Sequence, residues 1–163
     1  MKKFIIILSA VLFITSAVKS QIIISNDTTL CADFGYDLQA ISADYTGVGV
    51  DDSHSFIIEI GFNFNFYGVD YTQLLVSGNG YLTFNLSQAN QFSSWDITTA
   101  IPNPGSMPEN AIMAPWYDLV PDNSDQVIYA TVGISPNRMF IATWCNIPVY
   151  TCPNLIHTSQ VIL

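Results

Sequence analysis

The clearest pattern in the chain is a strict alternation of apolar and polar residues in the stretch GFNFNFYG, residues 61–68. Successive side chains of a strand point to opposite faces, so Phe62, Phe64 and Phe66 share one face while the Asn residues between them occupy the other. One apolar and one polar face are typical of a half-buried antiparallel strand. The pattern therefore predicts a core strand with its three Phe side chains turned inward.

Two further strands are predicted around this one. Residues 55–60 lead directly into the alternating stretch, and Gly61 at the junction indicates a bulge or a bend. Residues 74–77 and 81–84 flank Gly78-Asn79-Gly80. Asn-Gly supplies the positive φ angles of a tight hairpin, so these two segments are expected to pair as antiparallel neighbours.

A second group of strands is predicted at residues 111–116, 127–132, 138–146 and 157–163, with a turn at 133–137. Residues 85–110 are rich in Ser, Asn, Gln, Thr and Pro and are predicted to form a long surface loop. No window keeps the spacing of an amphipathic helix. Short strands separated by Gly, Pro and Asn, without crossover helices, predict an all-β fold: an antiparallel β-sandwich or a jelly-roll-like domain.

The N-terminus has the organisation of a secretory signal peptide. Lys2 and Lys3 precede an apolar run over residues 4–18, which is shorter than the roughly 18 residues that span a bilayer. Residues 1–20 are therefore predicted to be a signal peptide, and the mature chain is expected to be secreted and not inserted in a membrane. Residues 21–54 are then an N-terminal extension or the first strands, and residues 55–163 the sandwich domain.

Removal of the predicted signal peptide makes the chain strongly acidic. Arg138 is then the only Lys or Arg against thirteen Asp and Glu, a net charge of −12. Nucleic acid and anionic membranes are bound by clustered Lys and Arg, so both are excluded as partners. The charge favours solubility outside the cell and weak binding of cations.

The C-terminal segment and the cysteines both suggest that the sequence is a fragment. The chain stops at Leu163 within an apolar strand pattern, and natural proteins usually protect such an edge. Cys31, Cys145 and Cys152 are an odd number for a secreted protein, and they are candidates for disulfides whose pairing the sequence leaves open. We expect the domain to be incomplete at its C-terminus.

The densest group of carboxylates is the loop at residues 118–125, which contains Asp118, Asp122 and Asp125. Oxygen ligands on a flexible loop suit calcium, although the spacing is not that of an EF-hand loop. A solvated loop between strands is the favoured interpretation, and calcium is the alternative cofactor. Asp51-Asp52 is a second, smaller acidic pair, for which solvation is favoured more strongly.

No arrangement typical of an enzyme is found. His54 and His157 are the only histidines, and Ser77 lacks the preceding Gly of a nucleophile elbow. No catalytic residue is assigned and the protein is not expected to be an enzyme. Trp95 lies in the polar loop, where an aromatic side chain has no predicted core to enter, and it is a candidate contact residue for a ligand.

Four ordered stretches carry a family resemblance: residues 60–84, 109–121, 127–133 and 135–163. Together they resemble an extracellular β-domain of large secreted and cell-surface proteins of gliding bacteria, which are often exported by type IX secretion. The first two stretches are also similar to the nidogen-like extracellular domain. The resemblance implies a surface-associated module without known catalysis, and it implies that the domain continues past Leu163 with a cysteine that would pair with Cys152.

The sequence thus predicts a non-catalytic secreted module for adhesion, surface interaction or structural spacing within a larger protein. Its expected partners are an extracellular protein or a glycan surface and further domains of the same polypeptide. Two alternatives remain open. One is a carbohydrate-active enzyme or its sugar-binding accessory domain, suggested by the aromatic residues and carboxylates, and the other is a calcium-stabilised adhesive domain.

Overall fold

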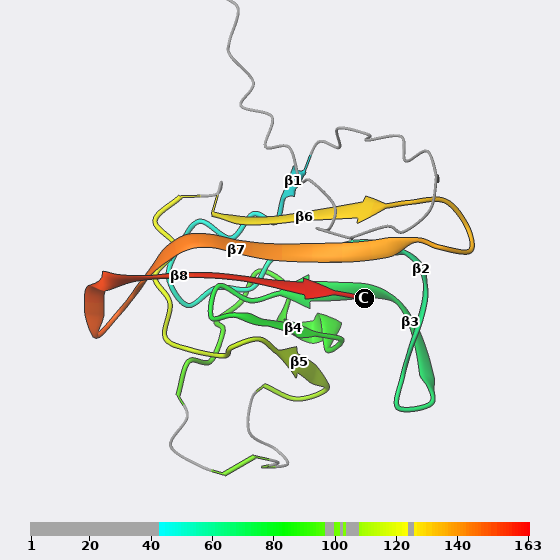
Figure 1. Ribbon diagram of the computed structural model, residues 1–163. Coiled ribbons are helices and arrows are strands. Elements are labelled where there is room, and N and C mark those ends of the chain that lie inside the picture. Colours follow the sequence, from blue (N-terminus) through cyan, green and yellow to red (C-terminus); the bar gives the residue numbers. More distant parts are fainter. Residues whose placement is uncertain (1–42, 97–99, 102, 104–107, 124–125) are drawn as a thin grey trace, which may run out of the picture.

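Two antiparallel sheets of four strands form the molecule in the computed structural model, which describes residues 43–163 except 97–99, 102, 104–107 and 124–125 (Figure 1). The strands are β1 Asp44–Tyr45, β2 Ile58–Phe66, β3 Val69–Val76, β4 Tyr81–Thr83, β5 Ala111–Met113, β6 Val127–Val132, β7 Met139–Val149 and β8 Cys152–Ile162. One 3₁₀ turn, η1 Leu86–Gln88, follows β4.

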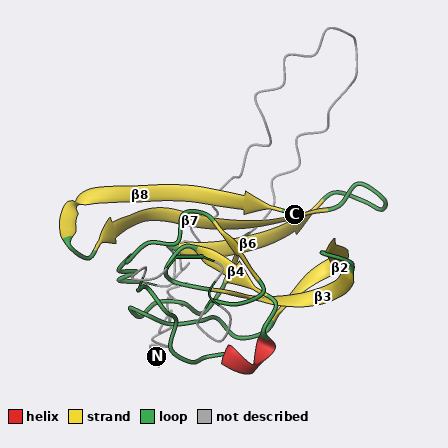
Figure 2. Ribbon diagram, turned by 90° about the horizontal axis from the view of Figure 1, so that it is seen from below, coloured by secondary structure: helices red, strands yellow, loops and turns green. Residues whose placement is uncertain are grey.

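The two sheets lie in separate layers (Figure 2). The first has the strand order β1-β6-β7-β8 and the second the order β2-β3-β4-β5. The predicted all-β sandwich is confirmed. Among the described residues, no helix is long and apolar enough to cross a membrane.

The core lies between the sheets and draws on both. Trp144 of β7 is fully buried, and its indole Nε1 donates a hydrogen bond of 2.8 Å to the carbonyl of Ser77, in the β3–β4 hairpin. This bond joins the first sheet to the second at the centre of the molecule. The principal cluster of buried apolar side chains is Val48, Ile58, Ile60, Leu74, Val76, Leu82, Phe84, Leu119, Val127, Phe140, Ala142, Trp144, Ile147, Val149 and Val161.

The alternating stretch forms the second half of β2, and the predicted orientation of its Phe side chains is confirmed. Phe62, Phe64 and Phe66 are partly buried and pack against the main core, whereas the residues between them are exposed. Gly61 has a φ of +87°, and the register of β2 with β3 shifts between Glu59 and Phe64. The bulge predicted from this glycine is therefore present.

The predicted β3–β4 hairpin also forms, but its turn differs from the expectation. Gly80 has a positive φ of +80°, whereas Asn79 is not among the residues with positive φ. Asn79 is fully buried and its side chain bonds to neighbouring loops, so tertiary contacts determine its conformation in place of the local turn preference.

The later strands match the predicted segments, with different ends. β5 stops at Met113 because the carbonyl of Gly80 accepts hydrogen bonds from the backbone of both Ala114 and Trp116, and the chain turns there. β7 continues to Val149 because a bulge near Asn146, whose φ is +53°, allows pairing with β8 to resume.

Candidate functional site

Three carboxylates meet at one end of the sandwich. Asp51, Asp52 and Asp118 each place a carboxylate oxygen within 4.8 Å of the others, and all three side chains are half-buried. The first two lie in the turn between β1 and β2, and the third follows β5. Asp52 has a φ of +53°, a conformation that Asp tolerates better than most residues.

Asn79 holds the two acidic segments together. Its amide Nδ2 donates to Asp52 Oδ1 at 2.9 Å, and its Oδ1 accepts the backbone N–H of Leu119, next to Asp118, at 3.0 Å. The Asp118 carbonyl accepts the N–H of Tyr150 at 2.9 Å. The geometry of the cluster is thus imposed by the β3–β4 hairpin and by the β7–β8 turn.

Burial and mutual repulsion make the charged form of this cluster unfavourable. Burial, and then the nearby Asp52 carboxylate, raise the pKa of Asp51 above its usual value. Burial, followed by the charges of Asp52 and Asp51, likewise raises the pKa of Asp118. Asp51 Oδ1 is buried without a hydrogen-bond partner in the described part of the chain. A bound cation would reduce the electrostatic cost of holding these carboxylates together.

A network of buried polar side chains lies next to the cluster. Ser77 and Ser93 are fully buried with their Oγ atoms in hydrogen-bond contact, and Asn79 Nδ2 also approaches the Ser93 carbonyl at 3.2 Å. The Tyr81 hydroxyl lies 2.8 Å from His54 Nε2, and both side chains are buried. Burial lowers the pKa of His54 and raises that of Tyr81, so both side chains are held neutral.

The hydrogen bonds of this network join the segment before β2, the β3–β4 hairpin and the segment around Ser93. His54 contacts Tyr81 through Nε2, and no described bond joins its ring to either serine. Both serines have no exposed surface, so a substrate has no access to their hydroxyls. The chemistry open to the site as a whole is the binding of a hard cation by carboxylate oxygens, the ligand type that calcium prefers.

The structure separates the acidic residues of the predicted calcium loop. Asp118 joins the cluster, whereas Asp122 lies outside it, where its backbone N–H donates to Gln126 Oε1 at 2.8 Å and its Oδ1 accepts from Asn123 Nδ2 at 2.7 Å. Asp125 lies outside the described residues. In the structure the carboxylates closest to Asp118 in this cluster are those of Asp51 and Asp52, which form a separate acidic pair in the sequence.

The remaining predicted residues are spread over the molecule. Trp95 has 41% of its surface exposed, and its neighbour Ser94 accepts a hydrogen bond of 3.0 Å from Trp116 Nε1. No disulfide joins Cys145 to Cys152, because Cys152 pairs in register with Val149, four residues further along β7 than Cys145. Cys31 and the predicted signal peptide lie outside the described residues.

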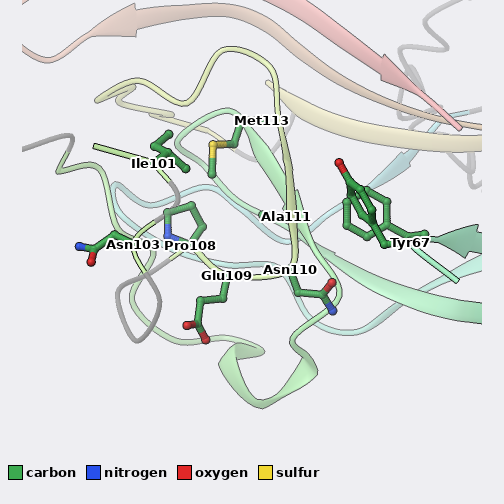
Figure 3. A pocket seen from close by; sticks show the side chains of 9 residues that line it. Tyr67, Ile101, Asn103, Pro108, Glu109, Asn110, Ala111 and Met113 are labelled. Carbon is green, nitrogen blue, oxygen red and sulfur yellow. The ribbon is translucent and has the colours of Figure 1, made fainter. Parts of the chain in front are cut away.

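A second candidate site, which the sequence did not indicate, is a groove beside the tip of the β2–β3 hairpin (Figure 3). It has a cavity volume of about 580 Å³ and is lined by Phe66, Tyr67, Ile101, Asn103, Pro108, Glu109, Asn110, Ala111 and Met113. The only hint in the sequence was that the alternating stretch ends on an aromatic residue followed by Gly68.

Comparison with known proteins gives one match. A family model described as NIDO related matches residues 33–163, which include both sheets, the acidic cluster and the groove. No curated protein and no solved structure matches the chain.

Proposed function

Because the chain belongs to the NIDO-related family, we propose that it is a non-catalytic extracellular module of a larger secreted or cell-surface protein. Its role in that protein is adhesion to extracellular proteins or glycan surfaces. The larger protein is proposed to be a surface protein of gliding bacteria, since four ordered stretches of the sequence resemble a β-domain of such proteins. A strongly acidic surface agrees with a soluble module outside the cell.

The main support for a non-catalytic role is that the potentially reactive side chains are buried. His54, Ser77 and Ser93 are enclosed within the sandwich and contact neighbouring polar groups, so they stabilise the fold and are withheld from substrates. The surface presents acidic residues and apolar side chains instead, such as Tyr67 and Trp95. Exposed aromatic side chains supply contact area for binding at a low cost in conformational entropy.

Adhesion and turnover can be measured on the same preparation. Beads coated with the protein are expected to attach to a surface of extracellular proteins or polysaccharide, with uncoated beads as the control. Incubation with polysaccharides is expected to release no reducing ends. Turnover that disappears in Asp118→Asn would overturn the proposal in favour of a carbohydrate-active enzyme, and a complete lack of attachment would leave only a spacer role.

One specific observation favours calcium stabilisation as a second candidate function. Asp51, Asp52 and Asp118 bring three carboxylates together from two segments, and a divalent cation would offset the burial and the mutual repulsion that raise the pKa values of Asp51 and Asp118. Calcium bound there would tie the β1–β2 turn to the segment after β5.

A further inference from the structure

The tip of the β2–β3 hairpin displays an aromatic ring in an unfavourable conformation. Phe66 pairs with Val69, so Tyr67 and Gly68 form a two-residue turn, and their φ values are +48° and +85°. Such turns favour Asn or Gly at both central positions, because a side chain with a positive φ collides with its own backbone. Tyr67 therefore costs conformational energy where Asn would not.

Tyr67 gains no burial in return. It has 93% of its surface exposed, and its ring touches Phe66 edge-on, with centroids 4.7 Å apart and an interplanar angle of 77°. Phe66 in turn packs on Phe84 at 5.1 Å, within the aromatic cluster of the core. The Tyr67 ring is therefore supported by Phe66, which packs against the core, while most of the ring surface is exposed to solvent. A residue held in a strained conformation without a gain in packing points to a function.

The other side of the groove supplies polar groups on an anchored backbone. The Thr83 hydroxyl donates to the carbonyl of Glu109 at 2.9 Å, and the N–H of Phe84 donates to that of Asn110 at 3.0 Å. Asn110 Nδ2 also donates to the Tyr71 hydroxyl at 2.8 Å, which fixes the plane of its carboxamide. In Figure 3, Asn110 and Ala111 lie between Tyr67 and the opposite wall of the groove.

The composition of the lining restricts the class of ligand. The described residues that line the groove include no Lys, Arg or His, and the one charged residue among them is Glu109. Phosphorylated, sulfated or carboxylated ligands would be repelled by the Glu109 carboxylate and by the net negative charge of the chain. A purely apolar ligand would displace water from the exposed Glu109 carboxylate and offer it no hydrogen bond in return. The class of ligand that suits this lining is a neutral molecule with one apolar face and many hydroxyl groups.

We propose that the groove binds a neutral glycan. The Tyr67 ring stacks on the apolar face of a sugar ring, while the Glu109 carboxylate accepts hydrogen bonds from its hydroxyl groups and Asn110 contributes its carboxamide. Glu109 is the only carboxylate among the described lining residues, and glycoside hydrolysis generally requires a pair, so binding proceeds without cleavage. This inference rests on the proposed adhesive function and gives it a ligand class.

The decisive variant is Tyr67→Asn, because Asn accepts the positive φ of the turn but offers no ring. Calorimetric titration of the purified protein with neutral oligosaccharides, such as gluco-, xylo- and manno-oligomers, is expected to show binding, and acidic or sulfated oligomers are expected to give none. Tyr67→Asn is expected to reduce the affinity about tenfold or more. Its melting temperature should be unchanged or higher, an effect opposite to that of losing a structural residue.

Two further variants complete the test. Tyr67→Phe keeps the ring and is expected to retain affinity within about threefold. Tyr150→Asn removes another exposed tyrosine, from the turn between β7 and β8, and is expected to bind as the original protein does. The proposal is overturned if no neutral oligosaccharide binds, if acidic oligomers bind better, or if Tyr67→Asn binds normally.

Bead attachment separates this proposal from the broader one. Attachment that neutral oligosaccharides block and Tyr67→Asn abolishes supports both proposals. Attachment that neither treatment affects overturns the glycan groove and leaves the adhesive function standing. A failure of the beads to attach to any extracellular surface overturns adhesion itself, even where calorimetry detects sugar in the groove.

Discussion

The side chain of Asn79 donates a hydrogen bond of 2.9 Å to the carboxylate of Asp52, and this contact joins the β3–β4 hairpin to the acidic turn before β2. The same side chain accepts the N–H of Leu119, so one buried carboxamide determines the distance between the two acidic segments. A residue of the hairpin turn thereby positions the cluster.

Replacement of Asn79 by Ala is expected to destabilise the protein by about 2 to 4 kcal/mol, because the buried N–H of Leu119 loses its acceptor and Asp52 loses a donor. Urea unfolding measures this change. Asn63→Ala, at an exposed position of β2, is the control and should alter the free energy of unfolding by less than about 0.5 kcal/mol. Equal effects of the two changes would show that the Asn79 bonds contribute little.

Calcium is expected to raise the melting temperature of the protein, and a chelator to lower it again, if the three carboxylates bind the ion. Asp118→Asn should abolish this response. In chelator the same variant should be more stable than the original protein, because a neutral amide removes the burial of a charge and the repulsion that together raise the pKa values in the cluster.

Asp122→Asn is the matched control for calcium, since Asp122 lies in the predicted acidic loop but outside the cluster. It should respond to calcium like the original protein. Identical melting with calcium and with chelator would instead mean that the carboxylates do not bind the ion. A response lost in Asp122→Asn but kept in Asp118→Asn would move the site to the loop.

Acidification is expected to destabilise the protein through His54. Burial lowers the folded-state pKa of this residue below its ordinary value of 6.5, so the unfolded state takes up a proton first as the pH falls. Stability is therefore full above about pH 6.5, declines below it, and levels off below the folded-state pKa. His54→Gln, which cannot titrate, should remove the decline in unfolding experiments across this range.

Three other residues modify the pH profile. His157 is only half-buried, and since burial lowers its pKa in the same direction, His157→Gln should remove a smaller part of the decline. Asp51 and Asp118 act oppositely. Their folded-state pKa values exceed 3.8, so stability rises as the pH falls through those values and the repelling carboxylates become neutral. A profile unchanged in His54→Gln would contradict the assignment to His54.

Gly61→Ala is expected to be more damaging than Gly68→Ala. Both glycines have φ values near +86°, but a Cβ at Gly61 would lie 2.9 Å from Thr131 Cγ2 on the facing sheet, whereas a Cβ at Gly68 meets nothing within 4 Å. Gly68→Ala should cost about 1 kcal/mol for the backbone conformation alone, and Gly61→Ala about 1 kcal/mol more. Urea unfolding of both variants gives the difference.

Thr131→Ser is expected to restore part of the stability lost in Gly61→Ala, because it removes the Cγ2 atom that the new Cβ would meet. It keeps the hydroxyl that donates to the Ile60 carbonyl at 2.9 Å. The double variant with Gly61→Ala should recover most of the additional loss. A double variant that loses as much as the two single changes together would show that the facing sheet is not what restricts position 61.

Much of the fold followed from local pattern. The period of two in β2, the Asn-Gly hairpin and the Gly and Pro punctuation between later segments predicted an antiparallel sandwich, because alternation and turn chemistry act over a few neighbouring residues. The ends of β5 and β7 were missed. Each depends on a partner distant in the chain: the Gly80 carbonyl for β5 and the strand β8 beyond the bulge for β7.

The sequence by itself determined the strand content, the inward face of the Phe stripe and the acidic charge, all of which depend on composition or on neighbouring residues. Only the tertiary structure decided that Asp118 meets Asp51 and Asp52 and separates from Asp122, and that Tyr67 and Glu109 line the same groove. The physical reason is that loop proximity comes from how two sheets stack. That stacking depends on buried contacts between distant segments, such as Trp144 with Ser77, which no local pattern encodes.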